Sequence, residues 1–245
     1  MAFAALRRRG VRFGRSNAPR AYASATIRRF WLLETVVAAS TQVDVLLLNA
    51  FVPIEQVGFY VAAKRLAGVL GFFTITANFV IAPRLSELHT RGEHAELQRQ
   101  LAYGALLATV PAACGFLVLL LVPSTLMGLF GPGFAAHGLL LVLCGLAQLV
   151  GAACGPVAVL LNQTGHELIT LRTRVATLIA SVLLGVPLCL AFEAVGAALT
   201  QVSLFLLWSG AMYLWTRRHT PYEPTVLALP SLWRARPVSA VGTAS

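Results

Sequence analysis

The segment from residue 57 to residue 88 constrains this chain more than any other, because a pair of charges lies inside a long apolar stretch. Residues 66–83 carry no charge, and with the preceding turns the segment is about 27 residues long, enough to cross a hydrocarbon layer of ~30 Å with some tilt. At ~1.5 Å per residue, Lys64 and Arg65 lie roughly 10 Å inside the beginning of this segment. Charges at that depth usually face the interior of a helix bundle or a water-filled cavity. We therefore predict a membrane-spanning helix that lines a cavity.

The composition of the whole chain is that of an integral membrane protein. Of its 245 residues, 58% are hydrophobic and 11% are charged, and the mean hydropathy is +0.76, whereas about a quarter of the residues of a soluble domain are charged. The net charge of +10 comes from 18 Arg and one Lys against nine acidic residues. Because the chain has no RNP, zinc-finger or helix-turn-helix pattern, and because basic loops are expected beside membranes, we expect no nucleic-acid partner.

The cysteine and histidine residues match no metal-binding pattern. The cysteines lie in apolar segments without CxxC or Cys/His spacing, so we interpret them as small buried apolar side chains: Cys114, Cys144, Cys154 and Cys189. His89 and His94 are five residues apart and do not match HExxH. The sequence therefore predicts no metal site and no cofactor.

Six apolar segments are each long enough to span a membrane, which predicts an all-α, polytopic helical bundle with six transmembrane helices. They cover residues 30–52, 57–82, 101–123, 134–160, 171–192 and 196–216. The Lys and Arg residues of the loops collect on one side of the membrane, among them Arg84, Arg91, Arg99, Arg172, Arg174, Arg217 and Arg218. Under the positive-inside rule, both termini are then cytoplasmic.

Three further segments flank or interrupt these spans. Residues 1–29 contain eight Arg and no acidic residue, which favours a basic cytoplasmic segment, with an organellar transit peptide as the alternative. Residues 83–100 mix charges with apolar positions and predict an interfacial amphipathic segment that is broken near Gly92. Residues 217–245 contain four Pro among small residues, which predicts a disordered cytoplasmic tail.

Four stretches, in this order and at this spacing, resemble the C-terminal half of one family. They are VGFYVAAKRLAG at 57–68, APRLSELHTRGEHAELQRQ at 82–100, LMGLFGPGF at 126–134 and GPVAVLLNQTGHE at 155–167. The family is that of the polysaccharide-biosynthesis flippases, the lipid-linked oligosaccharide exporters of the multidrug/oligosaccharidyl-lipid/polysaccharide superfamily.

This resemblance implies that the six spans form one lobe of a two-lobed transporter in the bacterial inner membrane. It also implies the function of a flippase, which moves an undecaprenyl-diphosphate-linked oligosaccharide to the outer leaflet for polysaccharide biosynthesis. Because the sequence begins near the expected connection between the lobes, we expect a homodimer or a separate N-terminal lobe to complete the central cavity. The other partners are the lipid-linked substrate and membrane lipid.

A lipid-linked diphosphate carries its anionic head through a layer that disfavours charge, so its path requires fixed cations or water. Lys64 and Arg65 are the cations that lie deep within a predicted span, and we predict that both bind substrate. Arg65 can fork two phosphate oxygens, whereas Lys64 acts as a mobile point charge. Lys64 shares its helix face with Gly68, Gly71 and Asn78, a smooth stripe that suits a cavity wall or close helix packing.

Two acidic residues of the first predicted span are candidate partners or ion sites. Asp44 lies at about the depth of Arg65, which predicts an Asp44–Arg65 ion pair that leaves Lys64 as the freer charge. Glu34 is a candidate site for a coupling cation or proton, with helix capping or pairing with Arg28 as the alternatives. Single amides inside the spans are candidate sugar contacts or interhelical hydrogen bonds: Gln42, Gln148 and Gln201.

Other functions compete with the flippase hypothesis. A truncated remnant that transports nothing, or a membrane scaffold for a glycan-assembly complex, would have the same helices. A membrane-embedded glycosyl- or phosphotransferase would need clustered carboxylates to hold a metal ion or activate a hydroxyl group. Glu34 and Asp44 are ten residues apart and the other acids are scattered, so we expect a protein that is not an enzyme.

Overall fold

The computed structural model of the protein describes residues 20–220, and every regular element among them is a helix. The predicted basic segment up to residue 19 and the predicted tail from residue 221 lie outside the described residues. The chain divides into two units, Met1–Thr35 and Val36–Ser245. The described part of the first unit is the beginning of helix α2, Arg20–Phe51. All later elements belong to the second unit.

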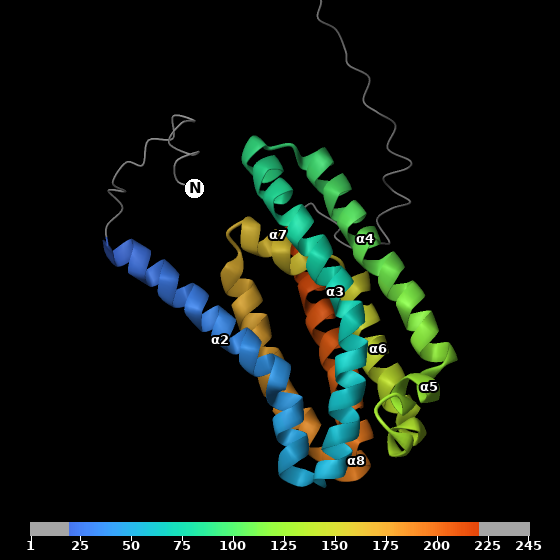
Figure 1. Ribbon diagram of the computed structural model, residues 1–245. Coiled ribbons are helices and arrows are strands. Elements are labelled where there is room, and N and C mark those ends of the chain that lie inside the picture. The colour runs from blue at the N-terminus through green and yellow to red at the C-terminus, as the bar shows by residue number, and fades with distance from the viewer. Residues whose placement is uncertain (1–19, 221–245) are drawn as a thin grey trace, which may run out of the picture. The chain divides into compact units, whose positions relative to one another are not determined.

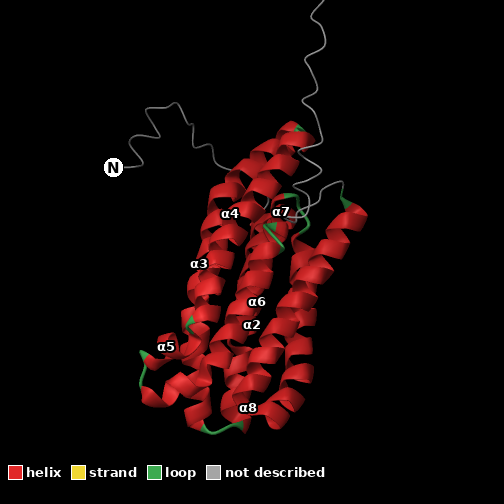
Figure 2. Ribbon diagram, turned by 90° about the vertical axis from the view of Figure 1, so that its right-hand side faces the viewer, coloured by secondary structure: helices red, strands yellow, loops and turns green. Residues whose placement is uncertain are grey.

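The second unit consists of long helices joined by short connections. After α2, helices α3 (Ile54–Arg91) and α4 (His94–Leu121) run antiparallel and lie side by side in both views (Figures 1 and 2). The remaining elements are α5 (Pro123–Gly128), the 3-10 helix η1 (Pro132–His137), α6 (Gly138–Ala153), α7 (Val157–Gln163) and α8 (Glu167–His219).

Helix α8 is a hairpin of two helical arms. A straight helix of its 53 residues would be ~80 Å long, but the backbone leaves helical geometry at Glu193, where φ is 48° and ψ is −128°. A Cβ atom added to Gly185 would lie 3.5 Å from Cγ2 of Thr200, so residues 15 positions apart are neighbours. In Figure 1 both arms extend from this bend toward the same end of the second unit, so the chain runs in opposite directions along them. Glu193 is the residue that separates the last two apolar segments of the sequence.

Four helical stretches among the described residues are long and apolar enough to cross a membrane: α3, α4, the combined η1 and α6 (Pro132–Ala153), and α8. The segment Val37–Phe51 of α2 is a shorter apolar helix. Large apolar side chains are exposed on these helices, as at Phe79 and Leu121, and such a surface suits contact with lipid tails. The chain is therefore a multi-pass membrane protein by the length and composition of its helices.

The segment 83–100 consists of the last turns of α3 and the first turns of α4, divided at Gly92. Gly92 has a left-handed backbone with φ of 71°, a conformation that suits a residue without a Cβ atom. Three leucines of this hairpin are fully buried and pack against Leu160 of α7: Leu85, Leu88 and Leu97.

Small residues allow the helices to approach one another closely. Helix α3 packs against α4 and α6, and α6 packs against α8. The buried positions of α3 and α4 include many alanines, such as Ala63, Ala67, Ala105 and Ala112, as is usual where membrane helices associate. The last turns of α2 join the same core through Leu48 and Val52.

Candidate functional site

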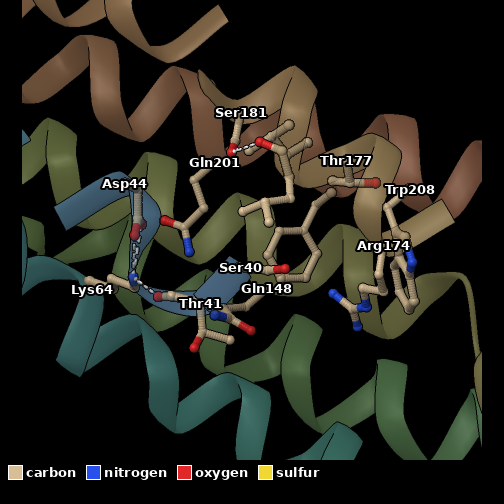
Figure 3. Close-up of a pocket in the computed structure, with 13 residues that line it drawn as sticks. Ser40, Thr41, Asp44, Lys64, Gln148, Arg174, Thr177, Ser181, Gln201 and Trp208 are labelled. Atoms are coloured by element: carbon tan, nitrogen blue, oxygen red, sulfur yellow. Dashed lines mark hydrogen bonds and ion pairs between the residues drawn. The ribbon is translucent and has the colours of Figure 1, made fainter. Parts of the chain in front are cut away.

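A polar pocket lies between the apolar helices of the second unit. It has a volume of about 170 Å³ and is lined by α2, α3, α6 and both arms of α8 (Figure 3). Nine of its thirteen lining residues carry a hydroxyl, amide or charged group, with Asp44, Lys64 and Arg174 supplying the charges. Polar groups are costly inside a membrane protein and usually mark a path for a substrate or an ion. This pocket is therefore the candidate site.

Lys64 of α3 lies at one end of the pocket and is fully partnered. Its Nζ atom lies 2.8 Å from each carboxylate oxygen of Asp44 and donates a third hydrogen bond of 2.6 Å to the backbone oxygen of Thr41. An ammonium group has three hydrogen atoms to donate. All three are used within the chain, so Lys64 is the positive half of a closed ion pair.

Asp44 is itself the centre of a network that joins three helices. Its residue is only 8% exposed, and its carboxylate also accepts hydrogen bonds from the hydroxyl group of Tyr60 and from the backbone nitrogen of Val45. The Tyr60 oxygen lies 3.3 Å from Oε1 of Gln201 on the second arm of α8. Asp44 therefore connects α2 to α3 directly and to α8 through Tyr60 (Figure 3 shows the Asp44–Lys64 contact).

The expected ion pair between Asp44 and Arg65 is wrong. Asp44 pairs with Lys64, and Arg65 is exposed and has no ion pair with any residue that the structure describes. Successive residues of a helix point ~100° apart, so the face that turns Lys64 toward α2 turns Arg65 away. The expectation that Lys64 is the freer of the two charges is wrong for the same reason, because Lys64 is the one that pairs with Asp44. Arg65 does not line the pocket, and its binding of substrate remains a prediction.

The other predicted residues have different surroundings. Asn78 is partly buried and lies outside the pocket lining. Gly71 faces the pocket-lining residue Gln148, because a Cβ atom there would lie 2.8 Å from Oε1 of Gln148. Gln148 and Gln201 both line the pocket, whereas Gln42 is exposed. The side chain of Glu34 lies outside the described residues.

Arg174 is a pocket cation that the sequence analysis placed in a loop. It lies seven residues after the beginning of α8, ~10 Å along the helix axis, and its guanidinium carbon is 4.0 Å from the ring centroid of Trp208 on the other arm. Figure 3 shows the two side chains next to each other. The Nε atom is buried without a hydrogen-bond partner.

A sequence signal for Arg174 did exist. Arg174, Thr177 and Ser181 recur at i, i+3 and i+7, which places them on one helix face within an apolar segment. Gln201 and Trp208 are also seven residues apart on the second arm. The positive-inside rule counts Arg174 with the loop charges, whereas this periodicity places it on a polar face of a helix.

Among residues 20–220, no group of three or more His, Cys, Asp and Glu side chains is arranged to hold a metal ion. With their own groups, the pocket residues can bind a polar ligand through N–H donors of Arg174, Trp208 and Gln148, beside the neutralised Lys64–Asp44 pair.

Comparison with known proteins gives one partial similarity. No family model matches the chain, and no solved structure matches it. The chain is similar to the protein named "Probable low-salt glycan biosynthesis flippase Agl15" of Haloferax volcanii, with 28% identity over 169 residues. The match covers 66% of this chain and 34% of that protein, so it spans about a third of the flippase. This supports a relation to glycan-biosynthesis flippases.

Proposed function

We propose that this chain is part of a membrane flippase that moves a lipid-linked glycan from one leaflet to the other. The observation that carries the proposal is the polar, charge-lined pocket between helices long and apolar enough to span a membrane. The partial similarity to a glycan-biosynthesis flippase supports it. The finer proposal is that the substrate is an undecaprenyl-diphosphate-linked oligosaccharide for polysaccharide biosynthesis, and that the lipid-linked glycan is moved without chemical change.

The size of the pocket limits which part of such a substrate it accepts. Pockets for drug-sized ligands have volumes of about 300–1,000 Å³, and this pocket has about 170 Å³. It suits a small anionic group better than an oligosaccharide. The glycan would then lie in a larger space, which we propose is enclosed with a second lobe, supplied by another copy of the chain or by a separate N-terminal lobe.

The proposed location is the bacterial inner membrane, with both termini cytoplasmic. The loop between α7 and α8 would then lie on the cytoplasmic side, together with Gly92 between α3 and α4. The connection between α2 and α3 and the bend at Glu193 would lie on the outer side. Every charge-rich loop is on the first of these two sides, which is the argument for this orientation.

A membrane scaffold that transports nothing is the second candidate, and one observation favours it. Lys64 and Asp44 satisfy each other, so this end of the pocket holds helices together without a ligand. A scaffold needs only such internal pairs. The scaffold hypothesis does not account for Arg174, whose charge has no ion-pair partner among the described residues.

Leaflet transfer in native membrane vesicles tests the proposal while keeping any partner in place. Vesicles from cells that produce the chain, and from the same cells lacking it, are loaded with a fluorescent undecaprenyl-diphosphate disaccharide. Dithionite then quenches the probe in the outer leaflet. We expect vesicles with the chain to lose nearly all fluorescence and vesicles without it to keep the inner-leaflet fraction. Equal quenching in both would contradict transport and favour the scaffold.

A further inference from the structure

We infer that Arg174, stacked on Trp208, forms an anion-binding subsite for a phosphoryl group carried by a lipid. The subsite is distinct from the Lys64–Asp44 pair at the other end of the same pocket. The choice of a lipid-linked phosphate rests on the proposed function, whereas the binding of an anion rests on the geometry of the pocket alone.

The charges of the pocket do not balance unless an anion is added. The charged residues that line it are Lys64, Arg174 and Asp44. Asp44 is fully engaged with Lys64, so Arg174 is the charge left over. Within the part of the chain that the structure describes, Arg174 forms no ion pair, and its Nε atom is buried without a hydrogen bond. A cation in a low-dielectric setting is costly without a partner, and a bound anion would supply one.

Trp208 holds the guanidinium group of Arg174 ready for such a ligand. The distance of 4.0 Å from the guanidinium carbon to the ring centroid is that of a cation–π contact. A guanidinium group over an aromatic ring keeps its N–H donors for other partners, and a phosphate can accept from two of them in a forked arrangement. Because the indole restricts the side chain before binding, less conformational freedom is lost when the ligand arrives.

Gln148 is the second donor, and the nearby hydroxyl groups are not. The amide of Gln148 lines the pocket and makes no hydrogen bond to another described side chain or backbone group. Thr177 and Ser181 donate their hydroxyl protons to backbone oxygens of α8, at 2.7 and 2.6 Å. The N–H donors of the pocket that make no hydrogen bond to described residues therefore include Arg174 Nε and Trp208 Nε1 on the two arms of α8, and the amide of Gln148 on α6.

Arg174 and Lys64 lie in the early turns of two helices that begin at opposite ends of the second unit (Figure 1). Arg174 follows the beginning of α8 by seven residues, and Lys64 follows the beginning of α3 by ten. Figure 1 shows these two helix beginnings at opposite ends of the second unit. In the proposed orientation the α8 end is cytoplasmic, so a lipid head group that enters from the cytoplasm meets Arg174 before it meets the Lys64–Asp44 pair.

Binding of a short polyprenyl diphosphate tests the subsite. The full chain in lipid nanodiscs is titrated with farnesyl diphosphate, with farnesol as the uncharged control. We expect Arg174→Gln to weaken farnesyl diphosphate binding by about 10- to 100-fold, because a charge-assisted hydrogen bond is lost. Arg174→Lys should recover part of the affinity. The matched control is Arg172→Gln, an exposed arginine two residues earlier that lies outside the pocket and should change affinity by less than about twofold.

The arms of the experiment separate the possible results. Inorganic pyrophosphate that competes as strongly as farnesyl diphosphate would support the anion subsite and overturn its preference for a lipid. Equal affinity of the wild type and a folded Arg174→Gln variant, checked by thermal unfolding, would overturn the subsite, as would farnesol binding as tightly as its diphosphate. Binding at Arg174 without leaflet transfer in vesicles would contradict the proposed transport and leave the subsite standing.

Discussion

The two cations of the pocket are stabilised in opposite ways. Lys64 uses all three of its donors on Asp44 and the backbone of Thr41, and its neighbour Tyr60 donates to the same carboxylate. Arg174 rests against the face of Trp208 and retains an unpartnered buried nitrogen. One end of the pocket is electrostatically closed, and the other is open to an additional anion.

This difference shows that the depth of a charge in an apolar helix does not reveal its role. Both cations lie well inside their helices, ~15 Å from the beginning of α3 for Lys64 and ~10 Å from the beginning of α8 for Arg174. Their partners distinguish them. Removing the partner of a paired cation is costly, because it leaves an uncompensated charge. A stacked and unpaired cation contributes little to stability and is available to a ligand.

The largest effect is expected from Asp44→Ala, which leaves Lys64 partly buried without its anion and Tyr60 without its acceptor. We expect a loss of about 3–5 kcal/mol in the free energy of unfolding, measured by denaturant titration in detergent micelles. The control is the double variant Asp44→Ala/Lys64→Met, which removes both charges and should recover most of that loss. A double variant as unstable as the single one would show that the loss does not come from the unpaired charge of Lys64.

The second-largest loss of stability is expected from Gly196→Ala, because both ends of the pocket depend on the hairpin of α8. A Cβ atom at Gly196 would lie 1.9 Å from the backbone oxygen of Leu188, and backbone cannot move aside as a side chain can. We expect a loss of about 3 kcal/mol, together with loss of farnesyl diphosphate binding.

The matched control for this substitution is Gly210→Ala on the same arm. No atom lies within 4 Å of a Cβ there, so the higher helix propensity of alanine should leave stability unchanged or raise it by up to about 1 kcal/mol. Similar effects of the two substitutions would argue against a tight hairpin at Glu193.

A smaller effect on stability is expected at the Arg174 end. Trp208→Leu and Arg174→Gln should each change the free energy of unfolding by about 1 kcal/mol or less, because a cation–π contact is lost and no ion pair is broken. Both variants should nevertheless bind farnesyl diphosphate more weakly. A loss of stability as large as that of Asp44→Ala would remove the contrast between the two ends.

The smallest effect is expected from Gly71→Ala, which displaces the amide of Gln148 without touching either cation. The added Cβ atom would meet the flexible end of Gln148 at 2.8 Å, so the cost should stay below about 1 kcal/mol. Affinity for farnesyl diphosphate should fall by a few-fold because a donor is moved. Gly68→Ala, with no atom within 4 Å of its Cβ, is the control and should leave affinity unchanged.

The sequence was sufficient for an all-helical structure with long apolar helices, although not for the count of six spans, and for the presence of charge inside apolar segments, because both follow from local composition. Apolar length predicts spanning helices, and the break at Gly92 follows from a glycine within a charged, polar stretch. Asp44 and Lys64 were both recognised as charges inside apolar segments and both line the pocket.

The pairing of those charges was not accessible from the sequence. Lys64 and Arg65 have almost the same depth and differ by ~100° around the helix, so only the position of α2 decides which of them meets Asp44. In the sequence, nothing distinguishes Tyr60 from the other aromatic residues of the apolar segments. Its role depends on the hydrogen bond that its hydroxyl group donates to Asp44. Arg174 was misplaced because the count of loop charges ignored the polar stripe that it begins on α8.

The most direct test of the account is to locate the phosphate in the pocket. Solid-state NMR on nanodiscs that contain the full chain, labelled with nitrogen-15 at the arginine guanidinium groups, measures dipolar coupling between these nitrogens and the phosphorus atoms of farnesyl diphosphate. The account predicts coupling that corresponds to N···O contacts of ~2.7–2.9 Å, present in the wild type and in Arg172→Gln and lost in Arg174→Gln. Coupling that persists unchanged in Arg174→Gln would place the phosphate on another arginine and contradict the account.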